Sequence, residues 1–156
     1  MKILLYNQAT AKEDWAAQAQ SLYLKKISHF FPIEVVTLKL KKLSRDDAAT
    51  KKEAESKLIL ENIQSSDYVL LFDEKGRPLN SIEFSKKFEL ALGSSKKRII
   101  MIIGGAYGVT DEVRQRADWV ASLSPLTFNH LLAETVALEQ VYRALTIIRN
   151  LPYHNS

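Results

Sequence analysis

The sequence predicts an α/β domain whose sheet is mostly parallel and flanked by helices. Short apolar runs alternate with helical patterns along the chain, which is the order expected of β–α units. Two of these runs, residues 68–72 and 98–103, are apolar almost throughout, as in strands that are covered on both faces. No internal repeat, low-complexity segment or linker interrupts the 156 residues. We therefore expect one domain, residues 1–156.

The first part of the chain is expected to hold two strands and two helices. Residues 3–6 and 33–40 are apolar or β-branched and predict strands. Between them, apolar side chains recur at helical spacing over residues 13–29, and Pro32 ends that helix. Ser44-Arg45-Asp46 offers a start for a charged helix that runs to about residue 62.

The middle of the chain is expected to continue the same alternation. Residues 68–72 predict a third strand, which the turn-forming residues 73–78 close. Ser81 is expected to cap the next helix, with Glu83 in its first turn, and Gly93 ends that helix.

The last part of the chain supplies two more strands and two more helices. Residues 98–103 and 119–123 predict the strands, and a short helix starting at Asp111 connects them. Residues 128–150 predict the final helix, which Thr127 or Asn129 could cap and Pro152 stops.

Composition excludes several function classes. The chain has no cysteine, which rules out disulfides, thiolate catalysis and cysteine-ligated metals. The histidines, His29, His130 and His154, form no metal-ligand pattern, so we expect no metal. Lysine and arginine number 22 against 18 acidic residues, a balance that fits a polyanionic partner without requiring one. The apolar run at residues 3–6 is far too short for a signal peptide or a membrane span, so a cytoplasmic protein is expected.

Glycines indicate where a ligand could bind. Four of the five glycines follow the third and fourth strands: Gly76, Gly104, Gly105 and Gly108. Ligands of open α/β sheets bind beyond the carboxyl ends of strands, and glycine lets a backbone approach a ligand closely. Gly76 alone is more typical of an ordinary turn, whereas the Gly104-Gly105 pair favours a ligand. The chain has neither a P-loop nor a Rossmann glycine fingerprint.

The segment after the fifth strand has two open interpretations. Residues 122–128 mix small hydroxyl side chains, a proline and apolar side chains, so this loop could enclose a flat apolar ring or could be a plain connection. The final helix is apolar nearly all round, which indicates either burial within the domain or packing against a second copy. A homodimer is therefore expected. His130 could line the site or cap the helix.

Two lysine-rich clusters could serve an RNA-binding role. They are Lys39-Lys41-Lys42-Arg45 and Lys96-Lys97-Arg98. Such clusters are most often solvated surfaces. As contacts to RNA phosphates they would be modest but adequate if a dimer doubled them.

Five motifs then carry a resemblance to a known family. They are Leu71–Gly76, Ile103–Gly108, Ser122–Ser124 with Leu126–Phe128, Leu138–Ala144 and Pro152–His154. In this order and spacing they resemble the ribosomal RNA large subunit methyltransferase H family, whose members are small enzymes of the SPOUT class. The resemblance covers essentially the whole chain.

The resemblance implies a fold, an activity and partners. The implied fold is a SPOUT methyltransferase domain with a C-terminal trefoil knot, assembled as a homodimer. The implied activity is S-adenosylmethionine-dependent methylation of N3 of pseudouridine 1915 in 23S rRNA of the assembled ribosome. Motif by motif, the resemblance assigns these residues to the cofactor: Phe72, Gly104, Leu123, Ser124, Pro125, Leu126, Thr127 and Phe128. We further hypothesise that Tyr153 and His154, docked across the dimer, close the partner's site and assist the proton or the placement of the base.

Other interpretations stay open at this point. The chain could methylate another RNA, could be a non-enzymatic RNA-binding or assembly module of the same fold, or could be an α/β enzyme that uses a different nucleotide. Two single positions and one short segment depart from the pattern of the family. Glu134 stands where many members have arginine, Asn155 stands where a basic residue often follows Tyr-His, and residues 7–10 lack the usual valine-glycine.

Overall fold

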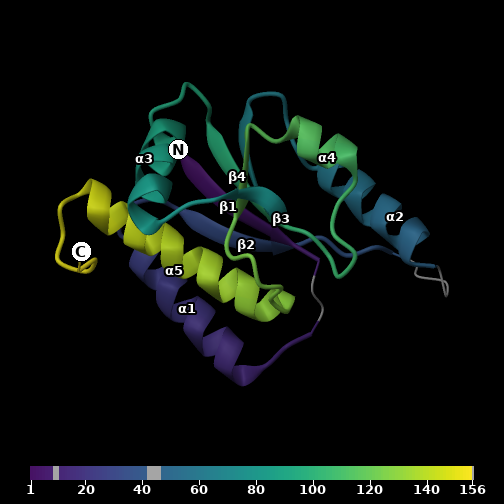
Figure 1. The fold of residues 1–156 in the computed structure, drawn as a ribbon, viewed down its shortest axis with the longest axis horizontal. Helices are drawn as coiled ribbons and strands as arrows, with labels where there is room; N and C mark the ends of the chain where they lie inside the picture. The colour runs from purple at the N-terminus through teal and green to yellow at the C-terminus, as the bar shows by residue number, and fades with distance from the viewer. Residues whose placement is uncertain (9–10, 42–46, 156) are drawn as a thin grey trace.

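A five-stranded sheet lies at the centre of the computed structural model, which describes residues 1–8, 11–41 and 47–155 (Figure 1). The strands are β1 (Lys2–Asn7), β2 (Ile33–Thr37), β3 (Asp67–Pro78), β4 (Arg98–Ile103) and β5 (Trp119–Ser122). The helices are α1 (Asp14–Ser28), α2 (Ala48–Glu61), α3 (Ser81–Leu92), α4 (Asp111–Arg116) and α5 (His130–Ile148). The strand order is β2-β1-β4-β3-β5, and every pairing is parallel. The predicted α/β class and its parallel sheet are confirmed.

Helices cover both faces of the sheet. Helices α1, α3 and α5 share one apolar core with the sheet, and α2 and α4 share a second core on its other face. Figure 1 shows α1 and α5 lying side by side, and α4 next to α2. Ile99 to Ile102 of β4 have no exposed surface, which confirms the strand expected to be covered on both faces.

The third strand is longer than predicted. Residues 73–78 were expected to form a turn, but β3 continues to Pro78 after a register shift between Phe72 and Arg77. The second part of β3 therefore pairs with the end of β5, Arg77 opposite Ala121. Gly76 permits this approach, because a Cβ there would lie 2.6 Å from the backbone carbon of Ala121. Glycine in this segment thus marks a close backbone approach within a strand.

Two boundary predictions are wrong. The cap of α3 is Asn80: its side chain accepts from the backbone N–H of Glu83 at 2.9 Å, and the Glu83 carboxylate accepts from the backbone N–H of Asn80 at 3.0 Å. The Ser81 hydroxyl instead donates to Gln140 Oε1 at 2.9 Å and joins α3 to α5. Strand β2 ends at Thr37, short of the predicted residue 40.

The starts of α2 and α5 also bear on the predictions. The predicted start at Ser44 to Asp46 lies outside the described residues, as do Lys42 and Arg45 of the first lysine-rich cluster. Asp47 caps α2 by accepting from the backbone N–H of Thr50 at 2.8 Å. Asn129, one of the two candidates, caps α5 by accepting from the backbone N–H of Leu132 at 3.0 Å.

Helix α5 ends before Pro152 acts as a breaker. Asn150 has a left-handed φ of 54°, and the N–H of Leu151 donates to the Thr146 carbonyl at 2.8 Å. This is a Schellman-type end, with asparagine in the place that glycine commonly takes. The chain then turns back along α5, so Tyr153 and His154 are next to the helix they follow.

The strand order determines where a site can form. Strands β4, β3 and β5 are neighbours, so the segments that leave their carboxyl ends meet at one edge of the sheet.

In the described part of the chain, no helix is long and apolar enough to cross a membrane. The trefoil knot implied by the resemblance stays a prediction.

Candidate active site

A cavity of about 730 Å³ lies at this carboxyl edge. Three segments form most of its wall: residues 72–75 at the register shift within β3, residues 103–109 at the exit of β4, and the loop between β5 and α5. The first turn of α5 closes it through His130 and Ala133. A cavity of this size, with a few polar groups among apolar walls, suits a ligand as large as a nucleoside derivative.

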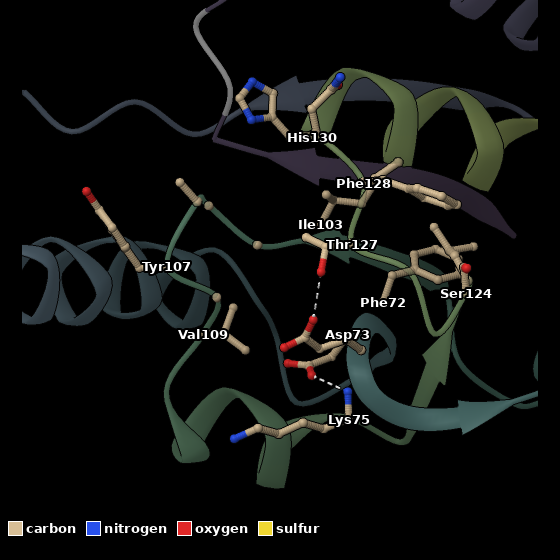
Figure 2. Close-up of a pocket in the computed structure, with 18 of the residues that line it drawn as sticks. Phe72, Asp73, Lys75, Ile103, Tyr107, Val109, Ser124, Thr127, Phe128 and His130 are labelled. Carbon is tan, nitrogen blue, oxygen red and sulfur yellow. Dashed lines mark hydrogen bonds between the residues drawn. The ribbon is translucent and has the colours of Figure 1, made fainter.

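Apolar side chains form one side of the cavity. Figure 2 shows Phe72, Ile103 and Phe128 close to one another on one side and Tyr107 on the other. Behind Phe72, the ring of Phe84 is stacked at 6.3 Å, and it also contacts the Trp119 ring at 5.0 Å. This aromatic cluster fixes the position of Phe72, so the apolar wall is preformed.

Internal hydrogen bonds shape the loop between β5 and α5. The Ser122 hydroxyl donates to the Ser124 carbonyl at 3.0 Å, and Ser124 Oγ accepts from the backbone N–H of Leu126 at 2.9 Å. The Thr127 hydroxyl points across the cavity to Glu74 Oε2 at 3.4 Å (Figure 2). The serines thus hold the loop in a folded conformation at the wall of the cavity.

A salt bridge fixes the wall of the cavity that residues 73–75 form. Arg114 of α4 bonds Asp73 Oδ2 through Nη2 at 3.0 Å and also bonds Asp111 Oδ1 at 2.9 Å. Asp73 Oδ1 accepts from the backbone N–H of Lys75 at 2.8 Å. The side chain of Asp73 is almost fully buried, so this pairing satisfies a carboxylate that would otherwise be costly to bury.

The structure brings most of the predicted cofactor residues together. Seven of the eight line the cavity: Phe72, Gly104, Leu123, Ser124, Leu126, Thr127 and Phe128. Pro125 is exposed and does not line it. Sequence reasoning missed Lys52 of α2 and Arg114 of α4, which also line the cavity. Nothing in their local sequence marks them, because only the fold places α2 and α4 beside the β4 exit.

Tyr153 and His154 are not part of the cavity in their own chain. The Tyr153 hydroxyl donates to Glu139 Oε1 at 2.9 Å, and His154 Nδ1 lies 3.3 Å from Arg143 Nη1. Glu139 is about 13 Å along α5 from His130 at the cavity, at 1.5 Å of rise per residue. Figure 1 places the C-terminus near the opposite end of α5 from its start. The tail is therefore docked away from its own cavity.

The docked tail has defined chemistry. Burial, followed by hydrogen bonding, raises the pKa of the Tyr153 phenol above its ordinary value, so it stays protonated and acts as a donor. The Arg143 guanidinium can only donate, so His154 Nδ1 accepts from it and the ring proton resides on Nε2. Both tail side chains are thus hydrogen-bond donors. Glu139 and Arg143 also form a salt bridge at 2.5 Å, so the two residues that hold the tail hold each other.

Comparison with known protein families identifies the class of protein. The model of the family described as "Predicted SPOUT methyltransferase" matches residues 1–154. The chain belongs to the SPOUT methyltransferase family.

Individual relatives share nearly the full length. A ribosomal RNA large subunit methyltransferase H of Bdellovibrio bacteriovorus is 60% identical over 155 residues, 99% of each chain. The proteins of that name in Syntrophotalea carbinolica and Parabacteroides distasonis are 37% and 35% identical, again over 99% of each chain.

Among the described residues, no cluster of histidine or acidic side chains could hold a metal ion.

Proposed function

We propose that the chain transfers a methyl group from S-adenosylmethionine to N3 of pseudouridine 1915 in 23S rRNA of the assembled ribosome, in the cytoplasm. The observation that carries the proposal is the cavity at the exits of β3, β4 and β5, of a size suited to this cofactor. Relatives named ribosomal RNA large subunit methyltransferase H support the class of RNA.

The residues present fit this cofactor. Phe72, Ile103 and Phe128 offer an apolar slot for an adenine ring, and the folded 122–128 loop offers backbone groups for the ring edge. The exit of β4 offers further backbone along residues 104–109 for the amino-acid end. When bound, S-adenosylmethionine would supply an electrophilic sulfonium methyl group for N3, leaving as a neutral thioether, and the imide proton of N3 would be lost to water.

The protein's task is to hold the reacting atoms in line and to favour the imide anion. Within one chain, no tail donor reaches the cavity. We propose that a second copy supplies Tyr153 and His154: the His154 Nε2–H would donate to a carbonyl oxygen beside N3, while Tyr153, whose one hydroxyl proton is donated to Glu139, would help to place the base. A donor aimed at that oxygen stabilises the negative charge that develops there. This arrangement requires the homodimer that the resemblance implies.

Methyl transfer from tritiated S-adenosylmethionine tests the activity directly. Assembled ribosomes, free 23S rRNA and tRNA are compared as acceptors, and mass spectrometry locates the methyl group. Thr127, which points into the cavity, gives a blocked variant in Thr127→Trp. Thr37→Trp, at the exposed end of β2, is its matched control. Labelling of pseudouridine in ribosomes by the control but not the blocked variant is expected. Labelling of tRNA alone would refute the assigned substrate.

Mixed dimers test the contribution of the partner's tail. A chain lacking residues 153–156 is mixed with a full-length Thr127→Trp chain and the subunits are allowed to exchange. If the tail acts across the dimer, each mixed dimer has one working site, and equal mixing restores about a quarter of the wild-type rate. If the tail acts in its own chain, or not at all, mixing restores nothing beyond the rates of the two parents.

A further inference from the structure

Helix α2 supports the β4 exit loop, residues 104–110, along one side. Lys52 lines the cavity, and three neighbouring positions of α2 contact the loop. The Ser56 hydroxyl oxygen accepts from the backbone N–H of Thr110 at 3.0 Å. Lys51 Nζ lies 5.9 Å from the centre of the Tyr107 ring. These contacts come from a helix that none of the cofactor motifs includes.

Glu55 is the third of these positions. It is only 5% exposed, and within the described residues its Oε2 atom has no hydrogen-bond partner. Lys51 Nζ approaches the other carboxyl oxygen, Oε1, at 3.9 Å. Burial raises the pKa of this carboxyl above the ordinary glutamate value, against the opposing effect of Lys51. A buried polar atom without a partner is costly, so its position needs an explanation.

The explanation lies in what the carboxyl group touches. A Cβ added at Gly105 would lie 2.2 Å from Glu55 Oε2 and 3.0 Å from Cδ. Gly105 does not have a positive φ, so its backbone conformation does not call for glycine. The absence of a side chain at Gly105 therefore makes room for the Glu55 carboxyl group, which lies directly against the backbone of the loop.

We propose that Glu55 is a positioning residue for the cofactor: its carboxyl group packs against Gly105 and fixes the path of the loop that forms one wall of the cavity. The proposal rests on the proposed function only in naming S-adenosylmethionine as the ligand. Because the contact is one of shape, glutamine should replace glutamate with little loss, whereas alanine should leave the loop unsupported.

A double-mutant cycle tests the contact. Calorimetry measures S-adenosylmethionine affinity for the wild type, Gly105→Ala, Glu55→Ala and the double variant, and thermal melting follows the same four proteins without ligand. The overpacked Gly105→Ala variant is expected to lose affinity about tenfold and Glu55→Ala about threefold. Independent effects would multiply to about thirtyfold. Coupled effects would make the double variant bind more tightly than Gly105→Ala and melt at a higher temperature.

Matched controls separate this contact from general damage. Gly93→Ala adds a methyl group with only ordinary contacts, the nearest at 3.5 Å, and Glu53→Ala removes an exposed carboxylate from the same helix. Both should bind as the wild type does, and Glu55→Gln should stay within about threefold. In methyl transfer, the Glu55→Ala defect should appear in the KM for S-adenosylmethionine rather than in kcat.

The outcomes distinguish this proposal from the proposed function. Two results would overturn the role of Glu55: changes in melting temperature that add, or a loss of affinity in the double variant of about thirtyfold or more, the product of the two single losses. If the melting temperatures couple but the wild type binds no S-adenosylmethionine, the assigned cofactor is wrong and the contact between Glu55 and Gly105 stands.

Discussion

The hydrogen bond from Tyr153 to Glu139 gives a quantitative prediction for the tail. Tyr153→Phe removes this 2.9 Å bond to a carboxylate, while the ring keeps its edge contact with Tyr142 at 4.7 Å and its place beneath the Arg143 guanidinium at 4.7 Å. A hydrogen bond to a charged group contributes about 1.5–3 kcal/mol. The site is partly exposed, so we take the lower end, about 1.5 kcal/mol. The docked-to-undocked ratio of the tail should then fall about tenfold.

Carboxypeptidase digestion measures that ratio, because cleavage of the tail requires it to leave α5. Tyr153→Phe should be trimmed about tenfold faster than the wild type, while the melting temperature of the domain changes little. Tyr68→Phe, a partly buried tyrosine on β3, is the control and should be trimmed at the wild-type rate. Equal trimming rates for Tyr153→Phe and the wild type would show that the ring contacts alone hold the tail, and would refute the hydrogen bond as its main anchor.

Three further predictions concern stability. Burial raises the pKa of Glu134, so the folded protein binds this proton more tightly than the unfolded chain. Its contribution to stability is therefore full below the ordinary glutamate pKa and is lost as pH rises through the raised value. Urea unfolding measures the loss of unfolding free energy between about pH 5 and about pH 8, which should be smaller for Glu134→Gln than for the wild type. An equal loss in the two proteins would contradict this role of Glu134. Arg98→Met leaves the fully buried Asp67 carboxylate without its 2.6 Å partner and should lower the unfolding free energy by about 3 kcal/mol. If adding Asp67→Asn restores none of it, the ion pair is not the cause. Gly76→Ala should destabilise the domain by about 2 kcal/mol in thermal melting through its close approach to β5, and a melting temperature equal to the wild type would refute that contact.

Local sequence patterns predicted the elements well and their ends less well. All five strands and five helices of the described chain occur in the predicted order. The main error is at residues 73–78, where the local pattern of turn-forming residues predicts a turn. The segment forms strand instead, because Arg77 pairs with Ala121, more than forty residues further along the chain. The sequence predicts Ser81 as the cap, but its neighbour Asn80 is also a good cap type. The choice depended on Gln140, which holds the Ser81 hydroxyl from another helix.

A cavity lies where the glycine pattern predicts a ligand, but one of the two glycines has another reason to be there. The Gly104-Gly105 pair predicts close approach by a ligand, and both glycines line the cavity. At Gly105, however, the atom that excludes a side chain belongs to Glu55, fifty residues earlier in the chain. A glycine pattern shows that space is reserved, but only the fold shows what occupies it.

The sequence departures from the family pattern are connected in the same way. The unusual first strand end and the unusual glutamate of the last helix meet, because Asn7 Nδ2 donates to Glu134 Oε2 at 2.6 Å. Asn7 is 5% exposed and Glu134 is 2% exposed, so Glu134 acts by joining β1 to the first turns of α5 rather than by touching RNA. Changing either residue alone would leave a buried polar group without its partner, which costs about 1–3 kcal/mol. The two departures are therefore one structural feature, which joins the end of β1 to α5 one turn after His130 at the wall of the cavity.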